Sequence, residues 1–448
     1  MKKIKSHRVF LIAASFFLLA SCEIKGGIQS MFQSSSSIAL SLTEGEKTVA
    51  EAMDVAKTVD LSVQTVDAYQ PTGSYQGIQA ITFDALPIAG RKTKVFAYLA
   101  LPKAASKDHP VPAIVLVHGG GGHPFLEWMT LWLNRGYAAI ALETTGYFPT
   151  AVNAGDSETS SAWKRELVAP FAAEGYALQP DNDGMQHSLL PIDQQWMYHA
   201  LADTLIASRI IASQEGVDAN KVGIMGISWG GVITSLALTF YPYAFALPIY
   251  GSGYLDEALS YQGKYFSNPA TQNLWLAQHR FAKAQMPILW QGWNADNNFS
   301  INSISKSYGD TAKINGRTRL SLVNNMLHSH SIAWGREEPY YFADTVCFGK
   351  AELPSFTANS SAKRQLSWHL DYDETAFSNL SVKAYYLTSP LAYDSSSTIA
   401  VAFTGLRLGL ANHEITGSLP AEAVAYYLEV KVDLNGANGF VSSPFIEL

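Results

Sequence analysis

The sequence has little cysteine and little charge. Its 448 residues include two cysteines, Cys22 and Cys347, and only 15% of them are Asp, Glu, Lys or Arg. The formal net charge is −7 and no stripe of Lys and Arg stands out, so the electrostatic footprint of a nucleic-acid-binding protein is missing. With 48% hydrophobic residues the chain can bury a large core, which argues against global disorder. The length suggests two or three domains.

Motifs that hold metals and nucleotides are also missing. No set of Cys and His residues has the spacing of a zinc site. The stretch Asp181-Asn182-Asp183-Gly184 carries carboxylates but lacks the spacing and the closing Glu of a calcium loop. The glycine run 119–122 does not end in Gly-Lys-Ser or Gly-Lys-Thr, and no dinucleotide-binding fingerprint occurs. We therefore expect no metal ion, no cofactor and no nucleic-acid partner.

The N-terminus has the pattern of an export signal. Lys and Arg are frequent in the first eight residues, and the apolar run 9–19 that follows is short for a membrane span. Leu19-Ala20-Ser21-Cys22 resembles the lipobox of bacterial lipoproteins, which implies that residues 1–22 are removed and that Cys22 carries lipid. The protein would then be exported and would touch the membrane only through this anchor. An ordinary secretory signal with a chance cysteine is the alternative. In either case the fold cannot rely on a disulfide, because Cys347 would be left alone.

The pattern of the remaining chain divides it into three regions. Residues 23–85, with a serine run at 34–37, are predicted to be a tether and an N-terminal extension. Residues 86–352 alternate apolar runs with helical stretches. The apolar runs carry no polar alternation, as expected for a parallel sheet covered by helices; they lie at 94–102, 113–117, 138–142, 222–227, 245–249, 287–293 and 319–325. The predicted class is α/β, with a doubly wound and mostly parallel sheet.

Two segments break this alternation. Residues 147–194 are polar and rich in Gly, Asp and Asn, and a stretch of that length suits a cap-like insertion on the substrate side. Residues 353–448 hold short runs rich in Val, Tyr, Thr and Leu without a long helix, and Asn435-Gly436 is a turn-forming pair. This region is predicted to be an all-β sandwich module.

The most informative short stretch is Gly226-Ile227-Ser228-Trp229-Gly230. It follows an apolar strand and precedes a helical run, which is the setting that a G-x-S-x-G nucleophile elbow requires. In such an elbow the serine occupies a strained turn, and the glycines avoid clashes with the neighbouring strand and helix. Ser228 is therefore predicted to be a nucleophile.

A serine hydroxyl needs a base and an acid that orients the base, and after an elbow the chain order is serine, acid, histidine. Asp296 follows the carboxyl end of the predicted strand 287–293, where ligand-facing residues of such a sheet gather, and it is the preferred acid with Asp256 next. His279 precedes that strand, and His369 and His413 lie in the β region; these positions leave His328 and His330 as candidate bases.

The run His118 to Gly122 follows the predicted strand 113–117 and is a candidate oxyanion loop. Glycines allow the backbone to approach a substrate closely, and two N–H groups are needed to stabilise the oxyanion of a tetrahedral intermediate. The amide of Trp229 is the first expected donor. Gly120 or Gly121 is expected to supply the second.

Taken together, "HGGGG", "GISWGG", "WNADNNF" and "HSH" resemble the α/β-hydrolase superfamily over residues 90–350. More narrowly they resemble exported bacterial serine esterases, grouped with acetylxylan esterases and dienelactone-hydrolase-like proteins. In that superfamily the histidine is often followed by a small residue, which favours His328 as base and leaves His330 as the alternative. Dienelactone hydrolases proper use a cysteine nucleophile, and Ser228 departs from that.

The resemblance implies hydrolysis of carboxylic esters, with acyl groups on carbohydrate as the expected substrate class. Two alternatives stay open. The Ser-Trp pair also resembles the Ser-Tyr elbow of X-Pro dipeptidyl-peptidase-like enzymes, which keeps a prolyl-type serine peptidase possible. A non-catalytic lipoprotein that binds glycans is the other.

Overall fold

The computed structural model describes residues 41–156, 160–180, 185–359 and 364–448, which belong to one compact unit. The predicted signal segment, Cys22 and the stretch 181–184 lie outside the described residues. In the described ranges no helix combines the length and the apolar character needed to cross a bilayer.

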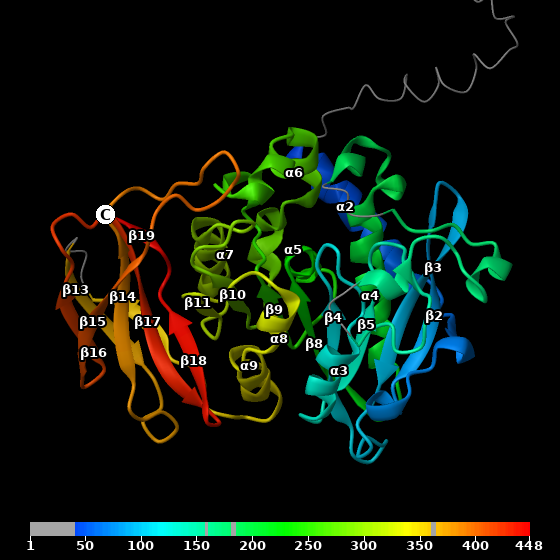
Figure 1. Cartoon of the computed structure of the whole chain (residues 1–448), viewed down its shortest axis with the longest axis horizontal. Helices are drawn as coiled ribbons and strands as arrows, with labels where there is room; N and C mark the ends of the chain where they lie inside the picture. The colour runs from blue at the N-terminus through cyan, green and yellow to red at the C-terminus, as the bar shows by residue number, and fades with distance from the viewer. Residues whose placement is uncertain (1–40, 157–159, 181–184, 360–363) are drawn as a thin grey trace, which may run out of the picture. The chain divides into compact units, whose positions relative to one another are not determined.

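A sheet of nine described strands forms the centre of the fold, in the order β1-β2-β3-β5-β4-β8-β9-β10-β11 (Figure 1). Strands β5, β4, β8, β9, β10 and β11 are parallel, whereas β1, β2 and β3 pair antiparallel and β3 joins β5 antiparallel. Their bounds are β1 Val63–Thr65, β2 Gln79–Ile88, β3 Arg91–Ala100, β4 Val111–Val117, β5 Ala138–Leu142, β8 Val217–Ile227, β9 Phe245–Ile249, β10 Leu289–Trp293 and β11 Arg319–Val323. The predicted α/β class is confirmed, and a strand occurs at each predicted run from residue 94 onward; the run 94–102, expected in the parallel sheet, belongs to β3, which is antiparallel to both neighbours.

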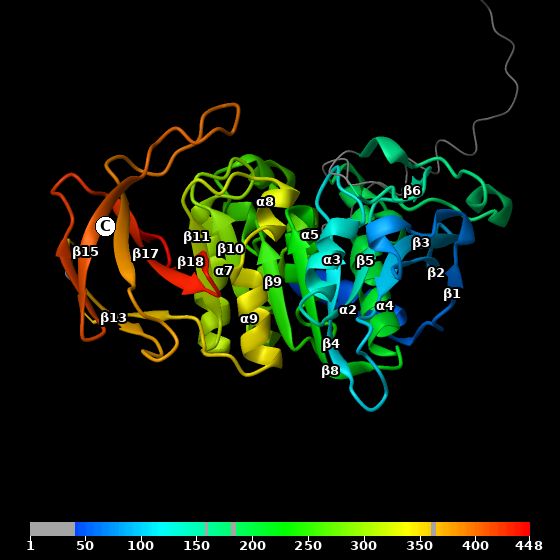
Figure 2. The ribbon, with the colours of Figure 1, turned by 60° about the horizontal axis from the view of Figure 1, so that its bottom comes forward.

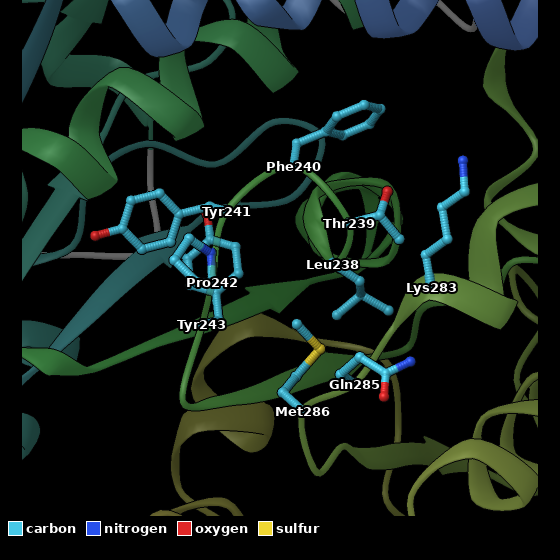
Figure 3. A pocket seen from close by; sticks show the side chains of 9 residues that line it. All are labelled: Leu238, Thr239, Phe240, Tyr241, Pro242, Tyr243, Lys283, Gln285 and Met286. Atoms are coloured by element: carbon cyan, nitrogen blue, oxygen red, sulfur yellow. The ribbon is translucent and has the colours of Figure 1, made fainter.

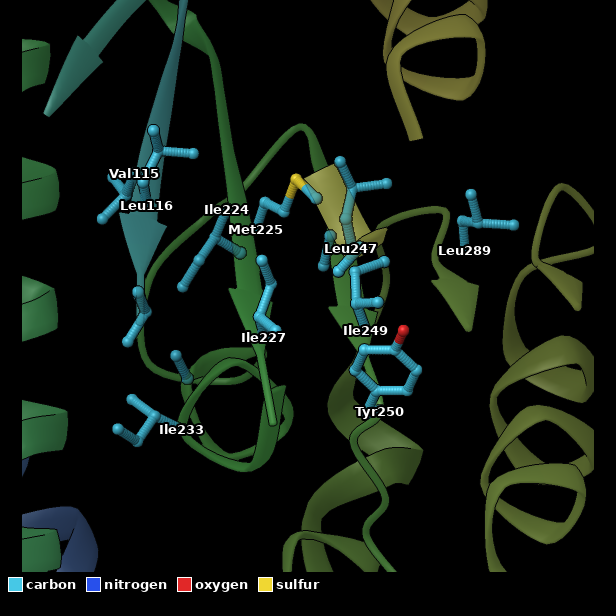
Figure 4. Packing of buried hydrophobic residues seen from close by; sticks show 14 of the residues in the cluster. Val115, Leu116, Ile224, Met225, Ile227, Ile233, Leu247, Ile249, Tyr250 and Leu289 are labelled. Atoms are coloured by element: carbon cyan, nitrogen blue, oxygen red, sulfur yellow. The ribbon is translucent and has the colours of Figure 1, made fainter. Parts of the chain in front are cut away.

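The central strands are buried on both faces because helices cover them. Every residue of β5, β9 and β11 is buried, and side chains from β4, β8, β9 and β10 pack together beside Ile233 of α5 (Figure 4). The described helices are α2 Leu42–Thr58, α3 Leu126–Leu133, α4 Trp196–Ala212, α5 Trp229–Ala237, α6 Pro269–Trp275, α7 Ile301–Ile314, α8 His330–Trp334 and α9 Glu338–Cys347, of which α3, α4, α5, α7 and α9 pack on strands of the sheet. Burial of each large aliphatic side chain stabilises the folded chain by about 1.5–3 kcal/mol. The packing of helices on the sheet therefore fixes the positions of the strands.

The N-terminal extension is more closely integrated than its weak pattern suggested. The boundary placed at residue 85 falls inside β2, and β1 and β2 belong to the central sheet. Helix α2 begins with a capping box, in which the Ser41 side chain accepts from the Glu44 N–H and the Glu44 carboxylate accepts from the Ser41 N–H. Strand β1 escaped detection because it is three residues long and exposed along its length.

The insertion 147–194 holds no α-helix in its described part. It contains a two-stranded ribbon, β6 Phe148–Pro149 with β7 Trp163–Lys164, and short 3₁₀ turns. Aromatic side chains of the insertion pack on the sheet. The ring centroids of Trp163 and Phe171 lie 5.3 Å and 6.3 Å, respectively, from that of Phe96 in β3. Its role as a cap on substrate stays a prediction.

In its described residues the C-terminal region contains strands and no helix. Its eight described strands form one hydrogen-bonded antiparallel sheet in the order β12-β13-β16-β15-β14-β17-β18, with β19 beside β17. Strand β15 pairs with β14 through residues 404–408 and with β16 through 409–411, so it links two sets of strands. The arrangement as a two-layer sandwich stays a prediction. The bounds are β12 Ser355–Ala358, β13 Gln365–Asp371, β14 Ser381–Leu387, β15 Thr404–Ala411, β16 Glu414–Ser418, β17 Ala425–Leu434, β18 Ala437–Ser442 and β19 Ile446–Glu447.

The two sheets meet where β18 approaches β11, the last strand of the central sheet (Figure 2). Ser442 of β18 accepts the Leu322 N–H at 3.0 Å and donates its hydroxyl to the Leu322 carbonyl at 3.3 Å. A single side chain thus satisfies both backbone groups of one residue on an edge strand, which otherwise exposes unpaired donors and acceptors.

Candidate active site

Ser228 occupies the sharp turn between β8 and α5. Its φ of 60° and ψ of −121° are strained values for a residue with a side chain. A methyl group on Gly226 would lie 2.0 Å from the Gly230 carbonyl oxygen, and one on Gly230 would lie 2.0 Å from the Val117 carbonyl oxygen. Both glycines are therefore required by the close approach of backbone. Within residues 222–237, Ser228 is the residue that is not fully buried, so the turn leaves it partly accessible to solvent.

Asp296 and His328, chosen from the sequence as acid and base, are brought together. Asp296 lies in the loop after β10 and is buried; its Oδ1 accepts the N–H groups of Asn298 at 2.7 Å and Phe299 at 3.0 Å. Its Oδ2 lies 2.8 Å from Nδ1 of His328. The carboxylate selects the tautomer with hydrogen on Nδ1, which leaves Nε2 of His328 to accept a proton.

Aromatic packing holds the His328 ring against the residue that follows β9. It stacks on Tyr250 at 4.3 Å between centroids and lies parallel to Phe299 at 5.9 Å. Tyr250 follows Ile249, whose carbonyl accepts the Ser228 N–H at 2.9 Å. The base and the serine therefore flank the same residue pair at the end of β9.

Asp256, the second candidate acid, has other partners. Its Oδ2 accepts from the Gln278 side chain at 3.4 Å, and among the described residues no hydrogen bond or ion pair joins Asp256 to a histidine. The geometry favours Asp296.

His330 contacts residues 119–122, called here the glycine loop, whereas His328 contacts Asp296. Its Nε2 accepts the Gly119 N–H at 2.9 Å, and its ring packs 5.0 Å from that of Phe125. Burial, followed by the charges of His118, His328 and His123, lowers the pKa of His330 to about 3. A neutral ring whose Nε2 already accepts a hydrogen bond is a poor proton acceptor, so the geometry favours His328 over His330 as base.

The glycine loop forms a tight turn in front of the elbow. The Gly122 N–H donates to the Gly119 carbonyl at 3.0 Å, and Gly121 has a φ of 69°, which favours glycine. Gly120 and Gly121 are exposed at its tip. The N–H of Trp229 belongs to the first turn of α5, whose amide groups have no partner inside the helix.

A buried pair beneath this loop escaped the sequence reasoning. His118 lies 2.8 Å through Nδ1 from the Gly119 carbonyl and 2.9 Å through Nε2 from the Glu143 carboxylate. Burial alone would raise the pKa of Glu143, but the hydrogen bond and charge of His118, with donors from Thr145 and Tyr147, lower it. Glu143 directly follows β5, and its place at the carboxyl end of a strand was the signal available in the sequence.

The described chain also has a cavity of about 460 Å³, and Ser228, Asp296 and His328 are not among the residues that line it. It is lined by residues 238–243 and by Lys283, Gln285 and Met286 (Figure 3). These residues precede β9 and β10, so the cavity lies at the amino ends of the strands, whereas Ser228 follows the carboxyl end of β8. No group of three potential metal ligands occurs within the residues that the structure describes.

Two family models match overlapping parts of the chain. The model of the acetyl xylan esterase family matches residues 46–244, which contain the glycine loop and the elbow. The model of the prolyl oligopeptidase family matches residues 182–348, which contain the elbow, Asp296 and His328.

Individual relatives match the chain in part. Dipeptidyl aminopeptidase BIII of Pseudoxanthomonas mexicana is 30% identical over 201 residues, which are 40% of this chain and 23% of that protein. The chain thus spans less than a quarter of this curated relative. The acetyl xylan esterase of Paenibacillus sp. R4 is 16% identical, covering 64% of this chain and 90% of its own, with a TM-score of 0.48. An acylaminoacyl peptidase of Pyrococcus horikoshii is 18% identical, covering 61% and 42% respectively, with a TM-score of 0.41.

Proposed function

We propose that this chain, an α/β-hydrolase that resembles acetylxylan esterases, cleaves carboxylic esters through Ser228, His328 and Asp296. The observations that carry the proposal are the pairing of His328 with the buried Asp296 at 2.8 Å and the strained elbow conformation of Ser228. A nucleophile, a base and an orienting acid on separate loops are what acyl transfer requires.

In the first half of the reaction, Oγ of Ser228 attacks the ester carbonyl while Nε2 of His328 takes its proton. The oxyanion accepts hydrogen bonds from the N–H of Trp229 and from an N–H of Gly120 or Gly121, and one such donor contributes about 3 kcal/mol. The intermediate collapses, the C–O bond to the alcohol breaks, and His328 donates its proton to the departing oxygen. Water then repeats the sequence on the acyl-enzyme and releases the acid.

Two further side chains support this geometry. His330 holds the glycine loop by accepting the Gly119 N–H, and its low pKa keeps the ring neutral at working pH. His118 links the same loop to Glu143. Both contacts fix the backbone that supplies the second oxyanion donor.

The proposed substrate class is acylated carbohydrate, with acetyl as the acyl group. The match of residues 46–244 to the acetyl xylan esterase model supports it. A serine peptidase of the prolyl type is the second candidate, because the prolyl oligopeptidase model spans the elbow, the acid and the base.

A matched substrate panel separates these functions. Initial rates on p-nitrophenyl acetate, acetylated xylan and aminoacyl p-nitroanilides are compared for the wild type and Ser228→Ala. The proposal expects release of acetate from xylan, slower anilide hydrolysis and loss of all activity in Ser228→Ala. Faster turnover of anilides than of esters would make the protein a peptidase, and no turnover with intact glycan binding would make it a binding protein.

We also propose that the protein is exported and anchored through lipid on Cys22, as its lipobox-like sequence implies. Expression in a bacterial host with and without Cys22→Ser tests this. The wild type should fractionate with membranes and gain the mass of a lipid, and the variant should do neither. Equal fractionation of the two would contradict the anchor.

A further inference from the structure

A hairpin of the C-terminal sheet reaches the central domain. Residues 391–400, called here the arm, lie between β14 and β15. The arm closes on itself: the Ala400 N–H donates to the Ala392 carbonyl at 2.8 Å, and the Asp394 N–H donates to the Thr398 carbonyl at 2.9 Å. Its tip is fixed by Oδ1 of Asp394, which accepts the N–H groups of Ser396 at 2.8 Å and Thr398 at 2.9 Å. The arm therefore has a defined shape of its own.

The arm contacts residues 294–300, called here the acid loop, which connect β10 to α7 and include Asp296. The hydroxyl of Tyr393 donates to the carbonyl oxygen of Asp296 at 3.1 Å. The N–H of Ile399 donates to Oδ1 of Asn297 at 3.3 Å. Tyr393 and Ile399 face each other across the arm, so its two sides hold two consecutive residues of the acid loop. Burial and the Asp296 charge raise the pKa of Tyr393, which keeps its hydroxyl protonated as a donor.

The same sheet also supports the strand that leads to the base. Ser442 of β18 holds both backbone groups of Leu322 in β11, six residues before His328. The ends of β10 and β11 are joined by Asn294, whose side chain donates to that of Asn324 at 3.2 Å. The C-terminal sheet thus contacts both the loop that carries Asp296 and the strand that leads to His328.

We propose that the arm is a positioning element of the active site, with Tyr393 as its principal residue. Tyr393 fixes the backbone of Asp296 and so the direction in which Oδ2 meets Nδ1 of His328. The inference rests on the proposed function, because it assigns a role in that reaction. The C-terminal sheet would then contribute to catalysis, because it carries the arm that positions Asp296. A small displacement of an orienting group is costly, since a shift of about 1 Å can reduce a rate about 100-fold.

Tyr393→Phe is the sharpest variant because it removes the hydroxyl and keeps the ring. Hydrolysis of p-nitrophenyl acetate is measured against pH, with Tyr386→Phe in β14 of the same sheet as the control. We expect kcat to fall about fivefold, the effect of one hydrogen bond, with KM within about twofold. The acidic limb of the kcat/KM profile should move to lower pH, because a misplaced Asp296 stabilises the His328 imidazolium less. Tyr386→Phe should match the wild type.

A shortened arm gives a larger perturbation. Replacing residues 393–399 by Gly-Gly joins Ala392 to Ala400, which are already hydrogen-bonded. We expect kcat to fall about 10- to 100-fold while the circular dichroism spectrum stays native. If this variant does not fold, Tyr393→Phe decides alone.

The outcomes separate the two proposals. Wild-type rates and pH profiles in Tyr393→Phe overturn the positioning role and leave the serine hydrolase intact. A wild type that hydrolyses none of the esters and anilides and does not react with a fluorophosphonate overturns the proposed function instead.

Discussion

At the scale of single residues, the strain at Ser228 must be offset by its surroundings. A φ of 60° for a serine costs about 1–3 kcal/mol. Two backbone hydrogen bonds hold the turn, from the Ser228 N–H to the Ile249 carbonyl at 2.9 Å and from the Val232 N–H to the Ser228 carbonyl at 3.1 Å. The turn is thereby tied to both β9 and α5, which holds the Ser228 backbone in the strained conformation.

The glycines around Ser228 give a prediction on stability. Gly230→Ala places a methyl group 2.0 Å from the Val117 carbonyl oxygen, and we expect the free energy of unfolding to fall by about 3 kcal/mol or more. The matched control is Gly309→Ala in α7, where no heavy atom lies within 4 Å of the added carbon. There we expect a gain of about 0.5–1 kcal/mol. Urea unfolding measures both, and equal effects would show that the elbow does not need its glycine.

The low pKa values of two buried histidines predict how the free energy of unfolding depends on pH. Burial lowers the pKa of His199 to about 4, against the raising effect of Asp193, and that of His330 to about 3. Both stay neutral in the folded chain at pH 5, whereas in the unfolded chain they take up protons below about 6.5. The free energy of unfolding therefore decreases as the pH falls from about 6.5 towards 4. At pH 5 the decrease is about 2 kcal/mol for each histidine.

The variant His199→Asn isolates one of these contributions. Between pH 7 and pH 5, its free energy of unfolding in urea should fall by about 2 kcal/mol less than that of the wild type. His109→Asn, at an exposed histidine, should keep the wild-type dependence. An identical fall in the wild type and in His199→Asn would contradict the depressed pKa.

At the scale of elements, the contact between β18 and β11 covers an edge of the central sheet. Ser442→Ala leaves the buried N–H and carbonyl of Leu322 without this partner, and we expect a loss of about 2 kcal/mol in unfolding free energy. Ser418→Ala removes an exposed hydrogen bond to the Gln365 side chain and should change stability by less than about 0.5 kcal/mol. Losses of equal size would mean that the edge contact contributes no more than a surface contact.

The elements also show how far sequence reasoning reaches. The parallel strands were predictable because each is a short apolar run, and Ser228 because its neighbours fix a local turn. The order of elements along the chain favoured Asp296 and left His328 and His330 as candidate bases, and the preference for His328 came from the resemblance to the superfamily. By contrast, β1 is exposed and three residues long, so it carries no apolar pattern.

Residues that act through distant contacts were out of reach. The link between His118 and Glu143 joins residues 25 apart, and that between His330 and Gly119 joins residues 211 apart. Tyr393 meets the acid loop from another sheet, 97 residues away. No spacing rule predicts such contacts, because the packing of complete elements creates them.

At the scale of the whole molecule, the site is assembled from distant segments. The glycine loop follows β4, the nucleophile follows β8, the acid and the base follow β10 and β11, and the arm comes from the C-terminal sheet (Figure 2). All the central segments converge at the carboxyl ends of parallel strands, where the loops of such a sheet gather. The proposed catalysis therefore depends on the complete fold.

The most direct test is the rate at which a fluorophosphonate reacts with the protein, followed by intact-mass and peptide mass spectrometry. We predict one adduct on Ser228, formed at least about 100-fold more slowly in His328→Ala, since general bases contribute about 10²–10⁴. Adding Asp296→Asn to His328→Ala should slow it little further, because the two residues act as a unit. An adduct on another residue, or a wild type that reacts no faster than His328→Ala, would contradict the account.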